Sequence, residues 1–159
     1  MSVLLARVTD YLEEMADLLE ALGENRHRIR AYRTAASVVG ANMGRFGRCL
    51  KDGTLERLPG IGADLAAKIH AVAIENSRPG EADLLAHIPE HADRLTAVPG
   101  IDRKLAIYLA ARLHVDSVSQ LRQLADTHML RTIPWLSADR EASIRDALVG
   151  WHGPRADPL

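Results

Sequence analysis

The feature that most constrains the fold is a five-residue turn that leads directly into an amphipathic helix. Residues 58–62 read Leu-Pro-Gly-Ile-Gly, and glycine adopts the positive φ that a tight turn requires. Leu65, Ile69 and Val72 follow at helical spacing and predict a helix over residues 63–75 with one buried face. Because a helix N-terminus presents unpaired backbone N–H groups, the pattern predicts an anion site that suits a phosphate. An ordinary turn between two packed helices is the alternative.

The same pattern occurs three times along the chain. Residues 98–102 read Val-Pro-Gly-Ile-Asp and residues 133–137 read Ile-Pro-Trp-Leu-Ser, and each precedes another helical stretch. A hydrophobic-Pro-Gly-hydrophobic-Gly turn before a helix is the signature of the helix-hairpin-helix motif. The first copy is intact, the second has Asp102 for the last glycine, and the third lacks both glycines. Repetition at this period predicts a modular helical array, whose third copy keeps the turn without close backbone approach to a ligand.

Hydrophobic periodicity elsewhere predicts an all-α protein, because no segment alternates like a strand. Gly23 is expected to cap the first helix, and Thr54 is expected to cap a short helix before the first hairpin. The expected helices cover residues 3–22, 26–40, 45–51, 55–58, 63–75, 81–87, 91–98, 102–113, 117–127 and 138–149.

A Ser-Arg-Pro-Gly turn at residues 77–80 predicts a boundary between two helical subdomains with tandem hairpins. Residues 1–78 hold the first hairpin, and residues 79–150 hold the second and the degenerate third. Residues 151–159 are expected to form a loose tail, because they contain one glycine and two prolines at the chain end.

Charge is distributed unevenly along the chain, although the net charge is only −1. Residues 25–70 contain nine basic and three acidic side chains, whereas residues 1–24 contain one basic and six acidic ones. Positive charge therefore surrounds the intact hairpin, which indicates a nucleic-acid partner. The acidic first helix is expected to lie away from that partner.

Several other classes of function find no support. Cys49 is the only cysteine, which excludes an internal disulfide and fits a reducing compartment. No apolar run is long enough to span a membrane, and the N-terminus lacks the basic region and cleavage site of a signal peptide. We therefore expect a cytoplasmic protein without a membrane partner. The seven histidines show no zinc-ligand spacing, so no cofactor is expected for chemistry.

These residues together resemble the N-terminal region of family X DNA polymerases, the polymerase beta-like family that includes bacterial members. Residues 27–38 (HRIRAYRTAASV) and 58–69 are similar to the lyase domain of that family, residues 95–101 to its next subdomain, and residues 130–134 to a third hairpin in bacterial members. The resemblance covers residues 8–150 and ends before the palm. Neither the carboxylates that hold two metal ions for nucleotidyl transfer nor the bacterial phosphoesterase module is found, so polymerase activity is not expected from this chain.

The resemblance implies non-sequence-specific binding to gapped, nicked or 5′-phosphorylated DNA in repair, with a polymerase or nuclease as a further possible partner. It also implies that hairpin carbonyls hold a monovalent cation, Na⁺ or K⁺. The carbonyls concerned are those of Leu58, Ile61, Thr96, Val98 and Ile101. The residues expected to contact DNA are Arg26, Arg28, Arg30, Arg33, Gly60, Ile61, Gly62, Pro99, Gly100, Ile101, Arg103 and Lys104.

Two further hypotheses remain open. By position, Lys68 matches the lysine that forms a Schiff base with a 5′-deoxyribose phosphate in the family, and His27 and Tyr32 match supporting residues. That chemistry needs a neutral amine, so it predicts a lowered pKa for Lys68, with Arg28 as a source of nearby positive charge. Asp64 departs from the family, which has a phosphate-binding lysine there. The other hypothesis is a helical adaptor whose hairpins contact proteins.

Overall fold

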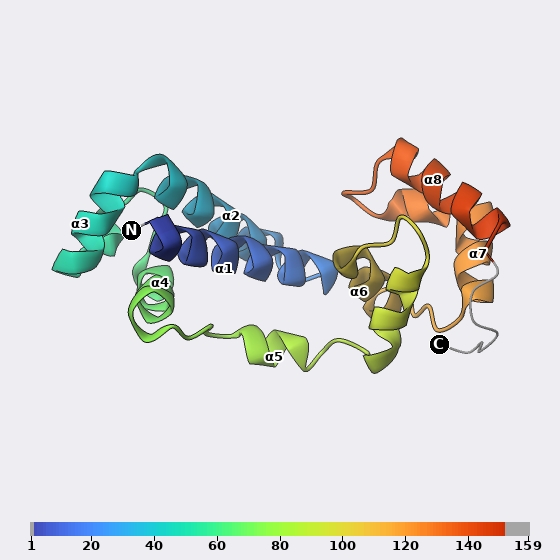
Figure 1. Ribbon diagram of the computed structural model, residues 1–159, viewed down its shortest axis with the longest axis horizontal. Coiled ribbons are helices and arrows are strands. Elements are labelled where there is room, and N and C mark those ends of the chain that lie inside the picture. Colours follow the sequence, from blue (N-terminus) through green and yellow to red (C-terminus); the bar gives the residue numbers. More distant parts are fainter. Residues whose placement is uncertain (1, 152–159) are drawn as a thin grey trace. The chain divides into compact units, whose positions relative to one another are not determined.

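A computed structural model describes residues 2–151 of the chain, and every regular element in this range is a helix (Figure 1). Of the tail expected at residues 151–159, residues 152–159 lie outside the described residues. The α-helices and the 3₁₀ helices, written η, are α1 (Ser2–Ala21), α2 (Arg26–Ala41), α3 (Met43–Asp52), η1 (Leu55–Arg57), α4 (Ala63–Glu75), α5 (Glu81–Leu85), η2 (Glu90–Ala97), α6 (Arg103–Ala111), α7 (Val118–Asp126), η3 (Met129–Thr132) and α8 (Ala138–Val149). The all-α prediction is confirmed.

Each of the three hairpins has the same local build: a 3₁₀ helix, a proline turn and an α-helix. The residue before each proline, Leu58, Val98 or Ile133, is extended, with ψ of 134°, 125° and 117°. Proline disfavours helical backbone at the residue before it, so the preceding helix must stop there. The predicted cap by Thr54 is wrong, because its side chain makes no capping hydrogen bond to η1.

The end of α1 follows the prediction for Gly23. This glycine has φ of +71°, its N–H donates to the Glu20 carbonyl at 3.1 Å, and the N–H of Glu24 donates to Leu19 at 2.8 Å. The two bonds form a Schellman motif, which turns the chain toward α2.

The chain divides into two compact units, residues 1–86 and residues 87–159. The division falls later than the turn expected to separate the subdomains, because residues 78–85 pack against α1. The Tyr11 hydroxyl donates to the Pro79 carbonyl at 2.6 Å, and Arg78 pairs with Glu14. The turn is therefore part of the first unit.

The core of the first unit is the contact of α1 with α2 and α4. Tyr11, Leu12, Met15 and Leu19 of α1 and Ile69 of α4 are completely buried. Because α1 buries one face in this core, α2 and the first hairpin are held in fixed positions beside it.

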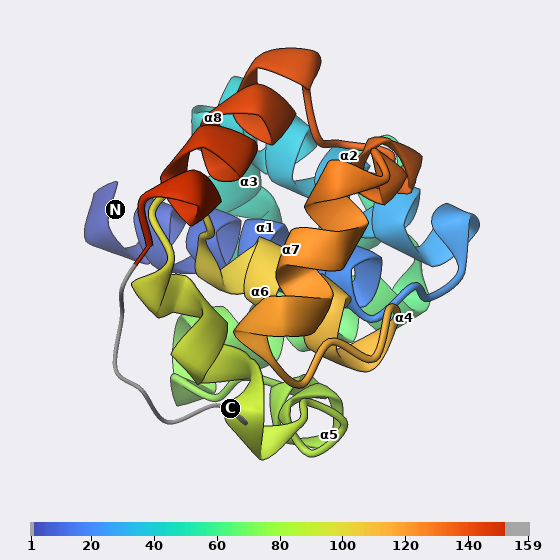
Figure 2. The same cartoon turned by 90° about the vertical axis from the view of Figure 1, so that its right-hand side faces the viewer.

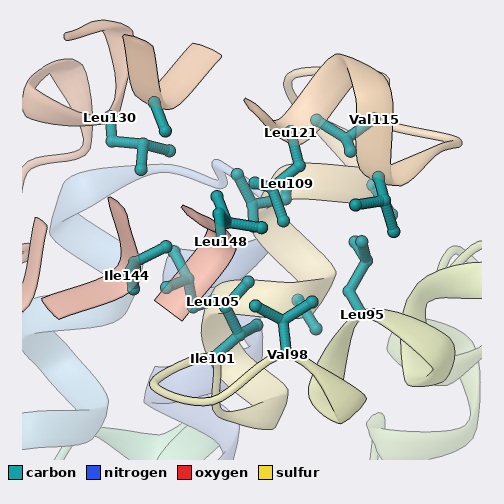
Figure 3. Close-up of a cluster of buried hydrophobic side chains, with 14 of the residues drawn as sticks. Leu95, Val98, Ile101, Leu105, Leu109, Val115, Leu121, Leu130, Ile144 and Leu148 are labelled. Carbon is teal, nitrogen blue, oxygen red and sulfur yellow. The ribbon is translucent and has the colours of Figure 1, made fainter. Parts of the chain in front are cut away.

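The second unit has an aliphatic core formed by η2, α6, α7 and α8 (Figure 3). Val98 and Ile101 of the second hairpin point into this cluster, next to Leu105. α8 packs against α7 and η3 (Figure 2). Among residues 2–151 we find no helix with the length and hydropathy needed to cross a lipid bilayer.

Candidate functional site

The first two hairpins share one turn geometry. The N–H of Ile61 donates to the Leu58 carbonyl, and the N–H of Ile101 donates to the Val98 carbonyl, both at 3.2 Å. Gly60 has φ of +82° and Gly100 has φ of +91°. Proline at the second position and a positive φ at the third define a type II turn, which favours glycine.

The third hairpin keeps the turn with a different backbone. The N–H of Leu136 donates to the Ile133 carbonyl at 3.2 Å, but Trp135 is not among the described residues with positive φ. A side chain is therefore accommodated where the other two hairpins need glycine.

The turn glycines lie against the protein itself. A Cβ on Gly60 would lie 2.9 Å from Thr34 Cγ2 of α2, and a Cβ on Gly100 would lie 3.1 Å from Ile144 Cγ1 of α8. Of the two glycines in the first turn, only Gly60 takes a positive φ, because Gly62 is extended at φ −86° and ψ −178°. Nothing lies within 4 Å of the position that a Cβ of Gly62 would occupy. Gly62 is therefore the glycine that leaves open space beside the turn.

The three helices that follow the hairpins differ at their N-terminal caps. In α6 the Asp102 carboxylate accepts from the Leu105 N–H at 2.9 Å, and in α8 the Ser137 hydroxyl accepts from the Arg140 N–H at 3.1 Å. Gly62 supplies no side-chain cap to α4. The first turn of α4 therefore presents backbone N–H groups without a side-chain acceptor, at the positive end of the helix dipole.

α2 contacts both the first hairpin and α4, and it carries several basic side chains. Arg30 lies one turn before Thr34, the residue against which Gly60 packs. Arg28 lies one turn before Tyr32, which contacts Lys68 of α4. Arg26, Arg28 and Arg30 are all exposed, so the structure leaves these three predicted DNA contacts accessible to a ligand.

Two further arginines that sequence reasoning missed lie beside the first hairpin. A guanidinium nitrogen of Arg45 in α3 donates to the Arg57 carbonyl at 3.3 Å, and Arg57 directly precedes Leu58. Both side chains are exposed. The basic block of residues 25–70 was the available sequence signal for them.

Arg33 has a different role from the one expected. Its guanidinium binds Glu13 and Asp17 at 2.7 Å and Glu20 at 3.3 Å, all on α1. Since these carboxylates already bind the guanidinium, the expectation that Arg33 contacts DNA does not fit its position. Carboxylates on the acidic face of α1 therefore neutralise this arginine and fasten α2 to α1.

Lys68 lies in a small polar cluster with Asp64 and Tyr32. Its Nζ is 2.8 Å from Asp64 Oδ2 and 3.2 Å from the Tyr32 hydroxyl, and its side chain is 22% exposed. Burial disfavours the ammonium, but the hydrogen bonds to Asp64 and Tyr32 outweigh burial and raise the pKa of Lys68 above its usual value. The predicted lowering of this pKa is therefore wrong. His27 is exposed at the start of α2, and no described hydrogen bond or ion pair joins its side chain to Lys68.

Charged side chains at the second hairpin contact other residues of the second unit. Lys104 Nζ lies 4.3 Å from the centre of the Trp135 ring, and Arg140 Nη2 lies 3.5 Å from Asp102 Oδ2. Pro99, Gly100 and Arg103 are exposed, and Ile101 is buried. Of the two predicted cations, only Arg103 extends from this helix start without such a contact.

A backbone carbonyl can bind a cation only if its oxygen keeps a lone pair that no hydrogen bond uses. Leu58 and Val98 each accept one turn hydrogen bond, which leaves a second lone pair on each oxygen. The Thr96 hydroxyl donates to the Asp93 carbonyl at 2.6 Å, and the buried Ile61 and Ile101 side chains anchor the two turns. Carbonyl oxygens are suitable donors for hard cations. Within the described residues, no group of three or more His, Cys, Asp or Glu side chains is arranged to hold a metal ion.

Comparison with protein families divides the chain in the same way as the structure. Residues 6–77 match the model of a helix-hairpin-helix domain, and residues 92–149 match that of a SAM-like helix-hairpin-helix tandem. No curated protein matches the sequence. The chain therefore carries two helix-hairpin-helix domains, which support DNA binding without sequence preference.

Proposed function

We propose that the two helix-hairpin-helix domains bind the sugar–phosphate backbone of DNA, and that the first hairpin is the principal phosphate site. The observation that carries this proposal is the uncapped start of α4, where Gly62 leaves open space and supplies no side-chain acceptor. Backbone N–H groups at a helix N-terminus bind phosphate oxygens. Such contacts fix position on DNA and carry no sequence information.

The charges around the first hairpin favour the same ligand. α2 contributes three exposed arginines, Arg26, Arg28 and Arg30. α3 contributes Arg45 and η1 contributes Arg57, which directly precedes the hairpin. Each phosphate neutralised by such cations releases counterions, so the affinity should fall steeply with salt. A flat salt response would contradict the proposal.

The DNA structure that suits this site best is a gap, a nick or a 5′-phosphorylated end in a repair intermediate. A terminal phosphate carries more negative charge than a phosphodiester and is not followed by a further nucleotide. The resemblance to family X polymerases supports this choice, and a separate polymerase or nuclease would then act at the same gap.

The decisive measurement compares one-nucleotide gapped DNA, with and without the 5′-phosphate, with intact duplex at several salt concentrations. We expect the gapped, phosphorylated DNA to bind tightest. Arg28→Ala and Arg30→Ala should weaken binding, whereas the matched control Arg112→Ala, an exposed arginine of the second unit, should not. Equal affinities for gapped and intact DNA would leave only general DNA binding. Failure to bind any DNA at low salt would favour the adaptor hypothesis.

The hairpin carbonyls of Leu58, Ile61, Thr96, Val98 and Ile101 would hold the monovalent cation of this proposal. A cation there would supply positive charge beside a DNA phosphate. The carbonyl oxygens of the two turns cannot supply that charge themselves. Replacing K⁺ by tetramethylammonium at constant ionic strength should therefore weaken DNA binding. Unchanged affinity would remove the cation from the proposal.

A second candidate function is a lyase in which Lys68 forms a Schiff base with the ring-opened sugar at an incised abasic site. The observation that favours it is the half-buried Lys68 beside the Tyr32 hydroxyl at 3.2 Å. The amine adds to the sugar aldehyde and water leaves, which requires loss of the ammonium proton. Because the pKa of Lys68 is raised, activity should increase with pH. Borohydride trapping of the Schiff base on DNA with an incised abasic site tests this function. The lyase is eliminated if no covalent adduct forms, or if Lys68→Ala gives as much adduct as wild type.

A further inference from the structure

The second hairpin carries its own anion at the start of α6. Asp102 Oδ1 accepts from the Leu105 N–H at 2.9 Å, and Asp102 Oδ2 lies 3.5 Å from Arg140 Nη2. The same Arg140 nitrogen lies 3.4 Å from the Gly100 carbonyl. A backbone amide and a guanidinium are the two kinds of donor that bind phosphate oxygens. A carboxylate of the chain therefore uses donors that a DNA phosphate would need.

We propose that Asp102 is an internal substitute for phosphate that restricts DNA binding at the second hairpin. This inference rests on the proposed function, since it concerns how that function is divided between the hairpins. The match of residues 92–149 to a helix-hairpin-helix tandem supports a phosphate-binding ancestry for this turn independently of the Asp102 contacts. DNA is held mainly by the first hairpin, and Asp102 sets how many phosphates the chain neutralises.

Solvent reaches the Asp102–Arg140 pair. The Asp102 side chain is 59% exposed and that of Arg140 is 38% exposed. Exposed ion pairs are weak, so removing the carboxylate should cost little folding stability. It should also release Arg140 and the Leu105 amide together for a phosphate.

The backbone permits an exchange of the two cap residues. Gly62 has φ −86° and ψ −178°, and Asp102 has φ −84° and ψ 175°. Both conformations suit glycine and aspartate, and a Cβ on Gly62 would have no heavy atom within 4 Å. Asp102→Gly therefore gives the second hairpin the cap of the first, and Gly62→Asp does the reverse.

The experiment measures binding of gapped duplex DNA by wild type, Asp102→Gly, Gly62→Asp and the double variant at several salt concentrations. Asp102→Gly should bind several-fold tighter, and log K should fall by about 0.9 more per decade of salt for one additional phosphate. Gly62→Asp should lose affinity, and the double variant should recover part of it. In ¹⁵N NMR spectra, DNA should shift the Leu105 amide in Asp102→Gly but not in wild type.

Asp102→Asn is the second variant, because asparagine keeps a capping acceptor without the charge. It should give an intermediate affinity, and it decides the question if Asp102→Gly loses helix by far-UV circular dichroism. Wild-type affinity and salt slope in the variants that fold, with an unshifted Leu105 amide, would overturn the inference and leave the proposed function intact. If wild type and variants all fail to bind DNA at low salt, the proposed function and this inference fail together.

Discussion

The first and second hairpins have the same turn but different helix faces after it. In the first, Asp64 and Lys68 lie near the uncapped end of α4, with the Tyr32 hydroxyl beside Lys68. The corresponding positions in the second, 40 residues later, are Lys104 and Tyr108. Trp135 of the third hairpin covers both: its ring lies 4.3 Å from Lys104 Nζ and packs edge-on against Tyr108 at 4.9 Å.

This difference separates the parts of the motif that fold the chain from the part that meets a ligand. The positive φ of Gly60 and Gly100 and their close packing against Thr34 and Ile144 are requirements of the fold. The residue two positions later and the outer face of the helix are not so constrained. In the first unit they leave open space at Gly62 and an exposed Asp64 beside Lys68, and in the second unit they make internal contacts.

The largest effect on stability is expected for Gly60→Ala. A non-glycine residue at positive φ costs about 1–2 kcal/mol, and the new Cβ would lie 2.9 Å from Thr34 Cγ2. With the cost of overpacking, we expect a loss of about 2–4 kcal/mol in the free energy of unfolding. Gly62→Ala should cost about 1 kcal/mol or less, because it removes only a weak cap.

Urea unfolding followed by two probes checks this prediction. Both tryptophans, Trp135 and Trp151, lie in the second unit, so fluorescence reports that unit, whereas far-UV circular dichroism reports both. Gly60→Ala should move the dichroism transition more than the fluorescence transition, and Gly100→Ala should move the fluorescence transition. Equal effects of Gly60→Ala and Gly62→Ala would show that the turn geometry is not what constrains this glycine.

The next effect concerns stability in acid, which we expect to depend on one buried carboxylate of the second unit. Glu141 in the second unit is 2% exposed, and it binds Arg131 at 2.8 Å and His128 at 3.1 Å. The hydrogen bond from Arg131, opposed by burial and assisted by His128, lowers the pKa of Glu141. A lowered pKa stabilises the fold above the unfolded value of about 4.3, and this stabilisation is lost as the pH falls through the folded value.

Glu141→Gln should therefore lower the urea midpoint measured by fluorescence at pH 7, and the difference from wild type should shrink between about pH 5 and pH 3. The control is Asp139→Asn, an exposed acid on the same helix, which should keep the acid dependence of the wild type. A difference that stays constant with pH would mean that the ionised form of Glu141 is not what stabilises the second unit.

Arg33 and Arg30 allow a comparison within the first unit, because two arginines of the same helix, α2, have different roles. Arg33 is 35% exposed and binds three α1 carboxylates, so Arg33→Ala should lower stability by about 1 kcal/mol. Its DNA affinity should stay near that of wild type. Arg30→Ala should change stability by less than about 0.5 kcal/mol while weakening DNA binding. Urea midpoints and gapped-DNA titrations of both variants test this, and loss of DNA affinity in Arg33→Ala would return that residue to the interface.

Local patterns predicted the features that depend on neighbouring residues. The helices at residues 63–75 and 138–149 and the cap at Gly23 follow from periodicity and backbone preference within a few positions. Features that depend on distant partners could not be predicted. Asp102 meets Arg140 from another helix, and the turn at Pro79 joins the first unit through Tyr11.

The pKa of Lys68 shows the same limit within a single helix. The lyase hypothesis required a lowered pKa for Lys68, with Arg28 as the source of nearby positive charge. Asp64 also lies one turn away on α4, and the direction of the shift depended on whether that carboxylate and the Tyr32 hydroxyl would reach the ammonium. Side-chain rotamers decide such contacts, and residue spacing alone does not.

The smallest expected effect tests whether the open face of the first hairpin is limited by Asp64. This carboxylate is 80% exposed and binds Lys68 Nζ at 2.8 Å. Asp64→Asn keeps a hydrogen-bond acceptor but removes the negative charge that helps to raise the pKa of Lys68, so this pKa should fall toward its usual value, as measured by NMR titration of the lysine Cε. DNA affinity should rise about two- to fivefold, because a negative charge near the helix N-terminus is removed. Asp139 occupies the same second position of α8, after the third hairpin, and Asp139→Asn should leave DNA affinity unchanged. Equal gains in both variants would indicate a general effect of net charge. They would mean that the phosphate does not bind preferentially at the first hairpin.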